Sequence, residues 1–241
     1  MRVLLPRPRV GIKIYFACMS PNVIELRQML AEKFPRLRAR AEAASFSQNQ
    51  WPTGVPQIDE PAGGGLLKGA LTEIIASGKS NGGALLLHKL IRDAAYTNQI
   101  ITLVDGRDSL DVAPLEQAVL SRLLWIRTRS VEEALKAVDL VLRDQNLPLV
   151  LLDLAASDER QLRKIPATTW HRFQRLIEIT STVCIVFTPH HLVARAHTQI
   201  KLHSRLSLNA FAHEAEQLVP MIKMEVTDAR PAHRERIQSI A

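Results

Sequence analysis

The sequence has few of the features that mark secreted or membrane proteins. It contains only two cysteines, Cys18 and Cys184, so it predicts no disulfide framework and fits a reduced, cytoplasmic protein. No apolar run approaches the roughly 18 residues of a membrane span. Pro6 and Pro8 interrupt the basic first segment, so no signal peptide is expected. Aromatic residues make up only 5% of the chain, so aliphatic side chains must form most of the core.

The charge balance is the feature that points to partners. Lysine and arginine outnumber aspartate and glutamate by 31 to 24, which gives a net charge of +7 and an isoelectric point near 9.8. A basic chain attracts nucleic acid or an acidic protein over long range, and the alternative is a merely soluble basic surface. With 241 residues, 46% of them apolar, the chain can form one α/β domain with an N-terminal arm.

Apolar segments that predict strands alternate with amphipathic segments that predict helices. Such alternation is typical of a mostly parallel sheet with helices on its faces. Parallel strands are predicted at residues 71–76, 100–104, 123–126, 149–152 and 183–187, and antiparallel edge strands at residues 205–208 and 221–226. Helices are predicted at residues 84–96, 114–121, 131–142 and 168–180. Ser130 is the expected N-cap of the third helix, because Glu132 and Glu133 follow it in the first turn.

The predicted domain organisation has three parts. Residues 1–50 form an arm with one amphipathic helix at residues 22–34, and residues 1–18 are expected to be a start-site artefact or a disordered lead. Residues 51–228 form the α/β core. Residues 229–241 are polar and basic, and they predict a mobile tail.

A glycine-rich loop follows the first core strand. In a phosphate loop of the form G-x-x-x-x-G-K-[ST], backbone N–H groups hold phosphates, the lysine reaches the β- and γ-phosphates, and the hydroxyl holds magnesium. Gly78-Lys79-Ser80 matches the end of this pattern, but the first glycine would then be Glu73, inside the strand. If the loop is counted from the end of the strand instead, the final G-K-[ST] of the pattern falls on Asn81-Gly82-Gly83. This register has neither the lysine nor the hydroxyl residue.

This second register predicts a degenerate loop that no longer hydrolyses nucleotide. The alternatives are a displaced Lys79 that serves a working site and a glycine turn unrelated to nucleotides. Asp153 follows an apolar run, as a magnesium-holding aspartate does, or it caps the next turn. No cofactor is predicted, although nucleotide binding without hydrolysis fits the same loop. The candidate nucleotide-binding residues are Ala76, Gly78, Lys79, Ser80, Asn81, Gly82, Gly83 and Asp153.

The segment before the loop resembles the opening of the RecA core. The similar residues are Thr53-Gly54, Ile58-Asp59, Gly64-Gly65-Leu66, Lys68-Gly69 and Thr72-Glu73-Ile74. In this order they resemble the ImuA family, RecA-like accessory proteins of bacterial translesion synthesis whose phosphate loop is also eroded. The resemblance covers residues 26–230 and implies a RecA-like fold.

The resemblance also implies that catalytic groups are missing. RecA-like enzymes carry a catalytic glutamate two residues after the aspartate of a strand end, and here Asp105 is followed at that spacing by Arg107. An arginine stays charged and cannot take a proton from the attacking water. The nucleotide-sensing Asn-Gln pair of RecA is replaced by Thr188-Pro189. Together with the loop, these changes predict that the protein is not an enzyme.

RecA contacts single-stranded DNA through loops after two strands, and this chain carries cations after residues 149–152 and 183–187. Such cations suit salt-sensitive phosphate contacts, and the alternative is a solvated or partner-facing surface. The candidates are Arg163, Lys164, Arg172, Arg175, His191, Arg195, Lys201 and Arg205. The histidines in this region lack metal-ligand spacing, so no metal site is predicted.

The resemblance implies a scaffold in damage-induced, error-prone DNA synthesis within the SOS response. Its partners would be an ImuB-like polymerase homologue and an error-prone polymerase III alpha subunit, with single-stranded DNA or RecA as further candidates and no membrane. One alternative is an active RecA-type, DNA-dependent ATPase that uses Lys79 and Asp153. A second is a SulA-like inhibitor of cell division, because that family shares an eroded RecA-like core.

Overall fold

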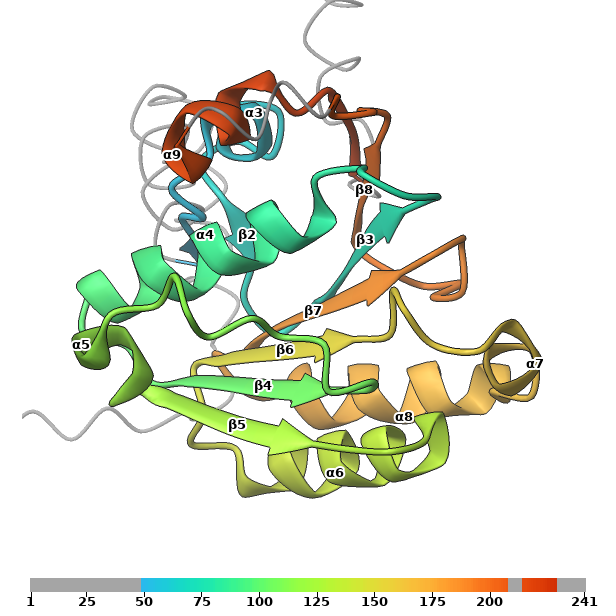
Figure 1. Cartoon of the computed structure of the whole chain (residues 1–241). Coiled ribbons are helices and arrows are strands. Elements are labelled where there is room, and N and C mark those ends of the chain that lie inside the picture. Colours follow the sequence, from blue (N-terminus) through green and yellow to red (C-terminus); the bar gives the residue numbers. More distant parts are fainter. Residues whose placement is uncertain (1–48, 208–213, 229–241) are drawn as a thin grey trace, which may run out of the picture. The chain divides into compact units, whose positions relative to one another are not determined.

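The computed structural model describes residues 49–207 and 214–228, so most of the predicted arm and the predicted tail lie outside the described residues. The described part is built on a seven-stranded, mostly parallel sheet in the order β5-β4-β6-β7-β3-β8-β9 (Figure 1). This confirms the predicted α/β fold with a RecA-like core. The strands are β3 Leu71–Ala76, β4 Ile101–Asp105, β5 Leu123–Arg127, β6 Leu149–Asp153, β7 Val183–Thr188, β8 Thr198–Leu202 and β9 Met224–Asp228.

Helices cover both faces of the sheet, which buries the apolar central strands from both sides (Figure 1). The core on one side contains Leu86 and Leu90, and the core on the other contains Val138 and Phe173. The longer helices are α4 Gly83–Tyr96 on the first side, with α6 Val131–Asp144 and α8 Ala167–Ile177 on the second. The short elements are α3 Pro56–Asp59, α5 Gln117–Leu120, α7 Glu159–Leu162, α9 Ala215–Leu218, the 3₁₀ helix η2 Val219–Met221, and an antiparallel pair of β1 Gln50–Trp51 with β2 Leu66–Leu67.

The N-terminus of α6 shows how local sequence sets an element. Ser130 Oγ accepts the N–H of Glu133 at 3.2 Å, as predicted for the N-cap. The Glu133 carboxylate in turn accepts the N–H of Arg129 at 2.9 Å. This reciprocal capping box satisfies two backbone donors, and a cap of this kind contributes about 1 kcal/mol.

The residues that carry the RecA resemblance form a tight turn ahead of the core. The Asp59 carboxylate accepts the N–H of Thr53 at 2.9 Å, the Thr53 hydroxyl at 2.8 Å and the N–H of Gly54 at 3.1 Å. Gly54 has φ +72°, and a Cβ there would lie 2.1 Å from an Asp93 carboxylate oxygen. The spacing of threonine, glycine and aspartate therefore follows from the geometry of this turn.

Two predictions about the last strands are wrong. Residues 203–207 are irregular, and the strand lies earlier, at Thr198–Leu202. This β8 strand pairs in parallel with β3 and antiparallel with β9. Its alternating buried and exposed residues were hidden by the basic side chains around them. The final strand begins at Met224 rather than at residue 221, because η2 occupies Val219–Met221.

Two predicted helices are shorter than expected. The helix predicted at residues 114–121 is α5, which starts at Gln117 because the N–H of Leu115 bonds the carbonyl of Val112 in a preceding turn. The helix predicted at residues 168–180 ends at Ile177, where the Thr180 hydroxyl and N–H both bond the Ile177 carbonyl.

Candidate functional site

The loop between β3 and α4 is the candidate nucleotide site. β3 ends with the buried Ala76 and α4 begins at Gly83, so the loop has the length that the second register predicts. The Ser77 hydroxyl donates to the carbonyl of Pro189 at 2.8 Å, and the carbonyl of Ser80 accepts the N–H of Leu206 at 2.8 Å. The loop is thus tied to the segments that follow β7 and β8, at the end of the sheet where α/β proteins bind ligands.

Asn81 closes this loop from inside. Its amide nitrogen donates to the carbonyls of Ala76 at 2.9 Å and Gly78 at 2.7 Å, and its amide oxygen accepts the N–H of Gly83 at 2.7 Å. In a phosphate loop, N–H groups at the start of the helix hold phosphate oxygens. Here the side chain of Asn81 takes such an N–H, so a phosphate would have to displace it.

The backbone beside Asn81 also disfavours the missing lysine and threonine. Gly82 has φ +86°, and a Cβ there would lie 2.8 Å from Ile222 Cδ1. A Cβ at Gly83 would lie 3.0 Å from the Cβ of Ala76. Lys79 and Ser80 are exposed and precede the helix. Glycine therefore fits both positions at the start of the helix, and a larger residue at either position would require the neighbouring atoms to move.

Asp153 lies at the carboxyl end of β6, and β7 separates it from β3. Its carboxylate accepts the N–H of Ala155 at 2.9 Å, which is the contact of an aspartate that caps a turn. Burial raises the pKa of Asp153 to about 6, the Ala155 hydrogen bond lowers it, and the neighbouring Asp105 raises it. Burial therefore makes Asp153 harder to ionise than an ordinary carboxyl, and its one backbone hydrogen bond is that of a turn cap.

Asp105, at the end of β4, holds the following loop. Its buried carboxylate accepts the N–H groups of Ser109 at 2.9 Å and Leu110 at 2.9 Å and the indole N–H of Trp125 at 3.3 Å. Arg107 is exposed, at the position where the resemblance places a catalytic glutamate. This strand end therefore carries a structural carboxylate and an exposed cation rather than a general base.

Glu73 is the buried charged residue that the sequence analysis did not single out as a site. It lies in β3, and its side chain is fully buried. One carboxylate oxygen accepts the N–H groups of Leu192 at 2.7 Å and Val193 at 3.0 Å and the Thr188 hydroxyl at 3.1 Å. The other lies 2.7 Å from His191 Nδ1. A glutamate inside an apolar strand was the signal available in the sequence, and its role is to hold the turn after β7.

The cations that follow β6 do not form one surface. Arg172, on α8, pairs with Asp139 of α6 at 2.8 Å, and Arg163 pairs with Glu159 one turn away at 2.9 Å. Lys164 and Arg175 are exposed, the first after α7 and the second in the last turn of α8. Two of the four residues therefore lie on α8 and two directly after α7, and Arg163 and Arg172 are each paired with an acid.

The cations that follow β7 are spread along the sheet. His191 contacts Glu73 near the end of β7, whereas Arg195 lies toward the opposite end, since the N–H of His197 bonds the carbonyl of Leu71 at the start of β3. Lys201 is exposed within β8, and Arg205 follows that strand. This segment is a crossover plus a strand, rather than the single loop that the resemblance suggested.

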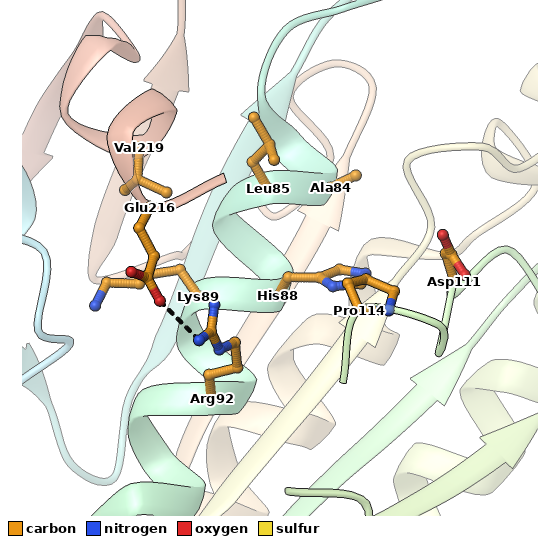
Figure 2. A pocket seen from close by; sticks show the side chains of 9 residues that line it. All are labelled: Ala84, Leu85, His88, Lys89, Arg92, Asp111, Pro114, Glu216 and Val219. Atoms are coloured by element: carbon orange, nitrogen blue, oxygen red, sulfur yellow. Dashed lines mark hydrogen bonds and ion pairs between the residues drawn. The ribbon is translucent and has the colours of Figure 1, made fainter. Parts of the chain in front are cut away.

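A pocket of about 230 Å³ lies beside α4, between α9 and residues 111–114 (Figure 2). The ring of His88 points toward Asp111, and Arg92 contacts Glu216 at 2.7 Å across the pocket (Figure 2). Burial lowers the pKa of His88, Asp111 raises it and Arg92 lowers it. The lining combines apolar residues such as Leu85 with both acidic and basic side chains, and no motif in the sequence pointed to this pocket.

Other reactive chemistry is sparse in the structure. Within residues 49–207 and 214–228, no group of three or more His, Cys, Asp or Glu side chains is placed to hold a metal ion. Cys184 is buried in β7, and burial raises the pKa of its thiol to about 12, so it is an inert core residue. No helix in the described part of the chain is both long and apolar enough to cross a membrane.

The sheet order and the strand–loop–helix unit define an α/β protein with a RecA-like core, in which the glycine loop is closed on itself. No protein-family model matches the chain, and no curated protein matches it.

Proposed function

We infer that the protein is a non-catalytic, RecA-like accessory factor of damage-induced, error-prone DNA synthesis, and that it acts in the cytoplasm. The observation that carries the non-catalytic part is the Asn81 side chain, which takes the N–H of Gly83 at 2.7 Å. One strand end supports it, because the exposed Arg107 stands where the resemblance places a proton acceptor.

The proposed partners are an ImuB-like polymerase homologue and an error-prone polymerase III alpha subunit, with single-stranded DNA or RecA as further candidates. They rest on the resemblance of residues 53–74 to the ImuA family. A protein that does not turn over a substrate can act as a scaffold, because its surfaces are available to bind partner proteins. Nucleotide binding without hydrolysis is compatible with this role, provided that the nucleotide displaces Asn81.

A hydrolysis assay tests the non-catalytic part. Pure protein with ATP, magnesium and single-stranded DNA should release no more phosphate than a Lys79→Ala variant does. Asn81→Ala should also release none, because it frees the N–H of Gly83 without supplying a base or a magnesium hydroxyl. Phosphate release that depends on Lys79 and Asp153 would establish the ATPase alternative instead.

Capture of the ImuB-like protein tests the scaffold part. The immobilised full chain should retain an ImuB-like protein under conditions in which a known ImuA does so. Retention of the division GTPase instead would favour the SulA-like alternative. Failure to retain the ImuB-like protein alongside a working ImuA control would remove the scaffold proposal, whatever the hydrolysis assay shows.

A further inference from the structure

The carboxyl edge of the sheet has two halves with different charge. Three segments begin at or just after the ends of β4, β5 and β6, at residues 106–111, 127–133 and 154–164, and with Arg127, the last residue of β5, they carry equal numbers of cations and acids. The cations are Arg107, Arg127, Arg129, Arg160, Arg163 and Lys164. The acids are Asp108, Asp111, Glu132, Glu133, Asp158 and Glu159. This half is locally balanced.

The other half is made of residues 77–82, 203–207 and 221–223, which contain no aspartate or glutamate. Lys79, Arg205 and Lys223, which we call the basic edge, are exposed there, and among the described residues none of them forms an ion pair. Glu225, on β9, lies 3.3 Å from His203 Nε2 and is the acid that approaches this half in the structure. The basic edge is therefore a local excess of positive charge.

Hydrogen bonds hold the three segments together. The N–H of Leu206 donates to the carbonyl of Ser80 at 2.8 Å, which joins the segment after β8 to the loop that carries Lys79. The N–H of Lys223 donates to the Ser204 hydroxyl at 2.6 Å, and the N–H of His203 donates to the Lys223 carbonyl at 2.8 Å. Figure 1 shows β3 and β8 side by side, as their parallel pairing requires. The cations are thus presented from a fixed backbone.

A pocket of about 300 Å³ lies between two of these segments. It is lined by residues 203–207, Met221 and Lys223, so Arg205 and Lys223 share it with the hydroxyls of two serines. Arginine, lysine and hydroxyl groups are the side chains that most often contact phosphate oxygens. No Phe, Tyr or Trp side chain is among the described residues that line the pocket, so its main contacts would be to phosphates.

We propose that the basic edge binds the phosphate backbone of single-stranded nucleic acid without sequence preference. The proposal rests on the proposed role in DNA synthesis and replaces the two predicted DNA loops with a different surface. Of the residues predicted to contact DNA, only Arg205 belongs to it. Lys79 was predicted to bind nucleotide and is here assigned to nucleic acid instead. Lys223 was not among the residues predicted for either site.

The test is binding of a fluorescent oligothymidylate of about 30 nucleotides to the full chain, followed by anisotropy. The variant Lys79→Glu, Arg205→Glu, Lys223→Glu reverses the basic edge. The matched control, Arg107→Glu, Arg129→Glu, Arg160→Glu, reverses three exposed arginines on the balanced half. All six side chains are exposed, so both variants should fold, which circular dichroism and the unfolding midpoint will verify.

The basic-edge variant should bind at least about tenfold more weakly, and the salt slope of log K should fall by about 2, since each lost phosphate contact contributes about 0.7 for a single strand. The control should stay within about twofold of the wild type. An equal or larger loss in the control would overturn the proposal. So would absence of binding by the wild type at about 50 mM salt.

The scaffold role is measured separately on the same two variants. Retention of the ImuB-like protein by both variants, with oligonucleotide binding lost only in the basic-edge variant, supports a nucleic-acid surface. If the wild type binds no oligonucleotide and reversal of the basic edge abolishes retention of the ImuB-like protein, the edge serves a protein and the proposal is wrong. Failure of retention with intact oligonucleotide binding would instead remove the scaffold proposal alone.

Discussion

Two carboxylates on different halves of the sheet's carboxyl edge, Glu73 and Asp153, have opposite surroundings. In the half formed by β3, β7 and β8, Glu73 is fully buried and contacts five hydrogen-bonding groups. In the half formed by β4, β5 and β6, Asp153 accepts a single N–H, from Ala155, and its pKa is raised to about 6. A buried carboxylate is stable as a charge only where donors surround it. The hydrogen bonds around Glu73 therefore stabilise its charged form, whereas burial destabilises the charged form of Asp153.

The two halves also differ in whether their arginine and lysine side chains form ion pairs. On the balanced half, Arg127 pairs with Asp108 and Arg163 pairs with Glu159. On the other half, the basic edge carries Lys79, Arg205 and Lys223 without ion pairs among the described residues. The glycine loop belongs to this second half, and the side chain of its own Asn81 bonds the loop's backbone groups. What distinguishes the second half is therefore surface charge rather than a working phosphate loop.

Removing the Glu73 carboxylate should have the largest effect. Glu73→Ala leaves the N–H groups of Leu192 and Val193 buried without an acceptor, so we expect a loss of about 3–5 kcal/mol in the free energy of unfolding. Urea denaturation measures it. Glu73→Gln keeps one acceptor oxygen and should lose less. A loss below about 1 kcal/mol for Glu73→Ala would show that the turn after β7 does not depend on this carboxylate.

Two glycines of the loop give the next largest effect and act as a matched pair. Both have positive φ, +77° at Gly78 and +86° at Gly82, so alanine is strained at either. A Cβ at Gly78 meets nothing within 4 Å, whereas one at Gly82 lies 2.8 Å from Ile222 Cδ1. We expect Gly82→Ala to cost about 3 kcal/mol and Gly78→Ala about 1 kcal/mol by thermal or urea unfolding. Equal costs would mean that Ile222 moves aside freely.

Asp153→Asn should stabilise the protein, in contrast to the Glu73 variants. The folded pKa of about 6 lies above the ordinary value of 3.8, so ionisation of Asp153 opposes folding fully above about pH 6 and not at all below about pH 4. Asparagine keeps the acceptor for Ala155 and carries no charge. We expect a gain of about 2 kcal/mol at pH 8 and none at pH 4, measured by urea unfolding. A loss at pH 8 in the presence of magnesium would instead indicate a metal-binding aspartate.

The smallest effect should come from the balanced half. Arg163→Ala breaks an exposed pair with Glu159 and should change the free energy of unfolding by less than about 0.5 kcal/mol. It should leave oligonucleotide binding within about twofold of the wild type. A clear loss of binding here would shift the nucleic-acid surface back to the segment after β6 and break the comparison between the two halves.

The strand predictions were most accurate where apolar runs were continuous. The runs at residues 149–152 and 183–187 are strands within a residue or two of the predicted bounds, because burial on both faces favours an uninterrupted apolar sequence. The strand at residues 71–76 was also predicted with its bounds, although Thr72 and Glu73 interrupt its apolar residues. The length of the glycine loop and the Ser130 cap were also predictable, because both depend on residues that are close together in the sequence. β8 was missed because its buried Thr198, Ile200 and Leu202 alternate with polar residues in a basic context.

The site residues were harder to predict than the strands. Asn81 stands at the final glycine position of the second register, and only the folded loop shows its three hydrogen bonds. Arg172 looked free to bind a partner, but α6 brings Asp139 to it. Asp139 lies on another helix, so no local pattern could reveal its pair with Arg172. The partners of Asn81 are local, but residue types alone do not show which backbone groups a loop side chain bonds.

The sequence by itself determined the alternation of strands and helices, the length of the loop after β3, and the absence of a lysine and hydroxyl at the start of the following helix. Each of these depends on short-range patterns of apolar residues, glycines and caps. Only the tertiary structure decided that Asn81 fills its own loop, that Glu73 holds the turn after β7, and that Lys79, Arg205 and Lys223 meet at one edge. The Asn81 hydrogen bonds are local and depend on the folded shape of the loop. The other two outcomes depend on the strand order, which places β3 between β7 and β8 and so joins segments more than a hundred residues apart.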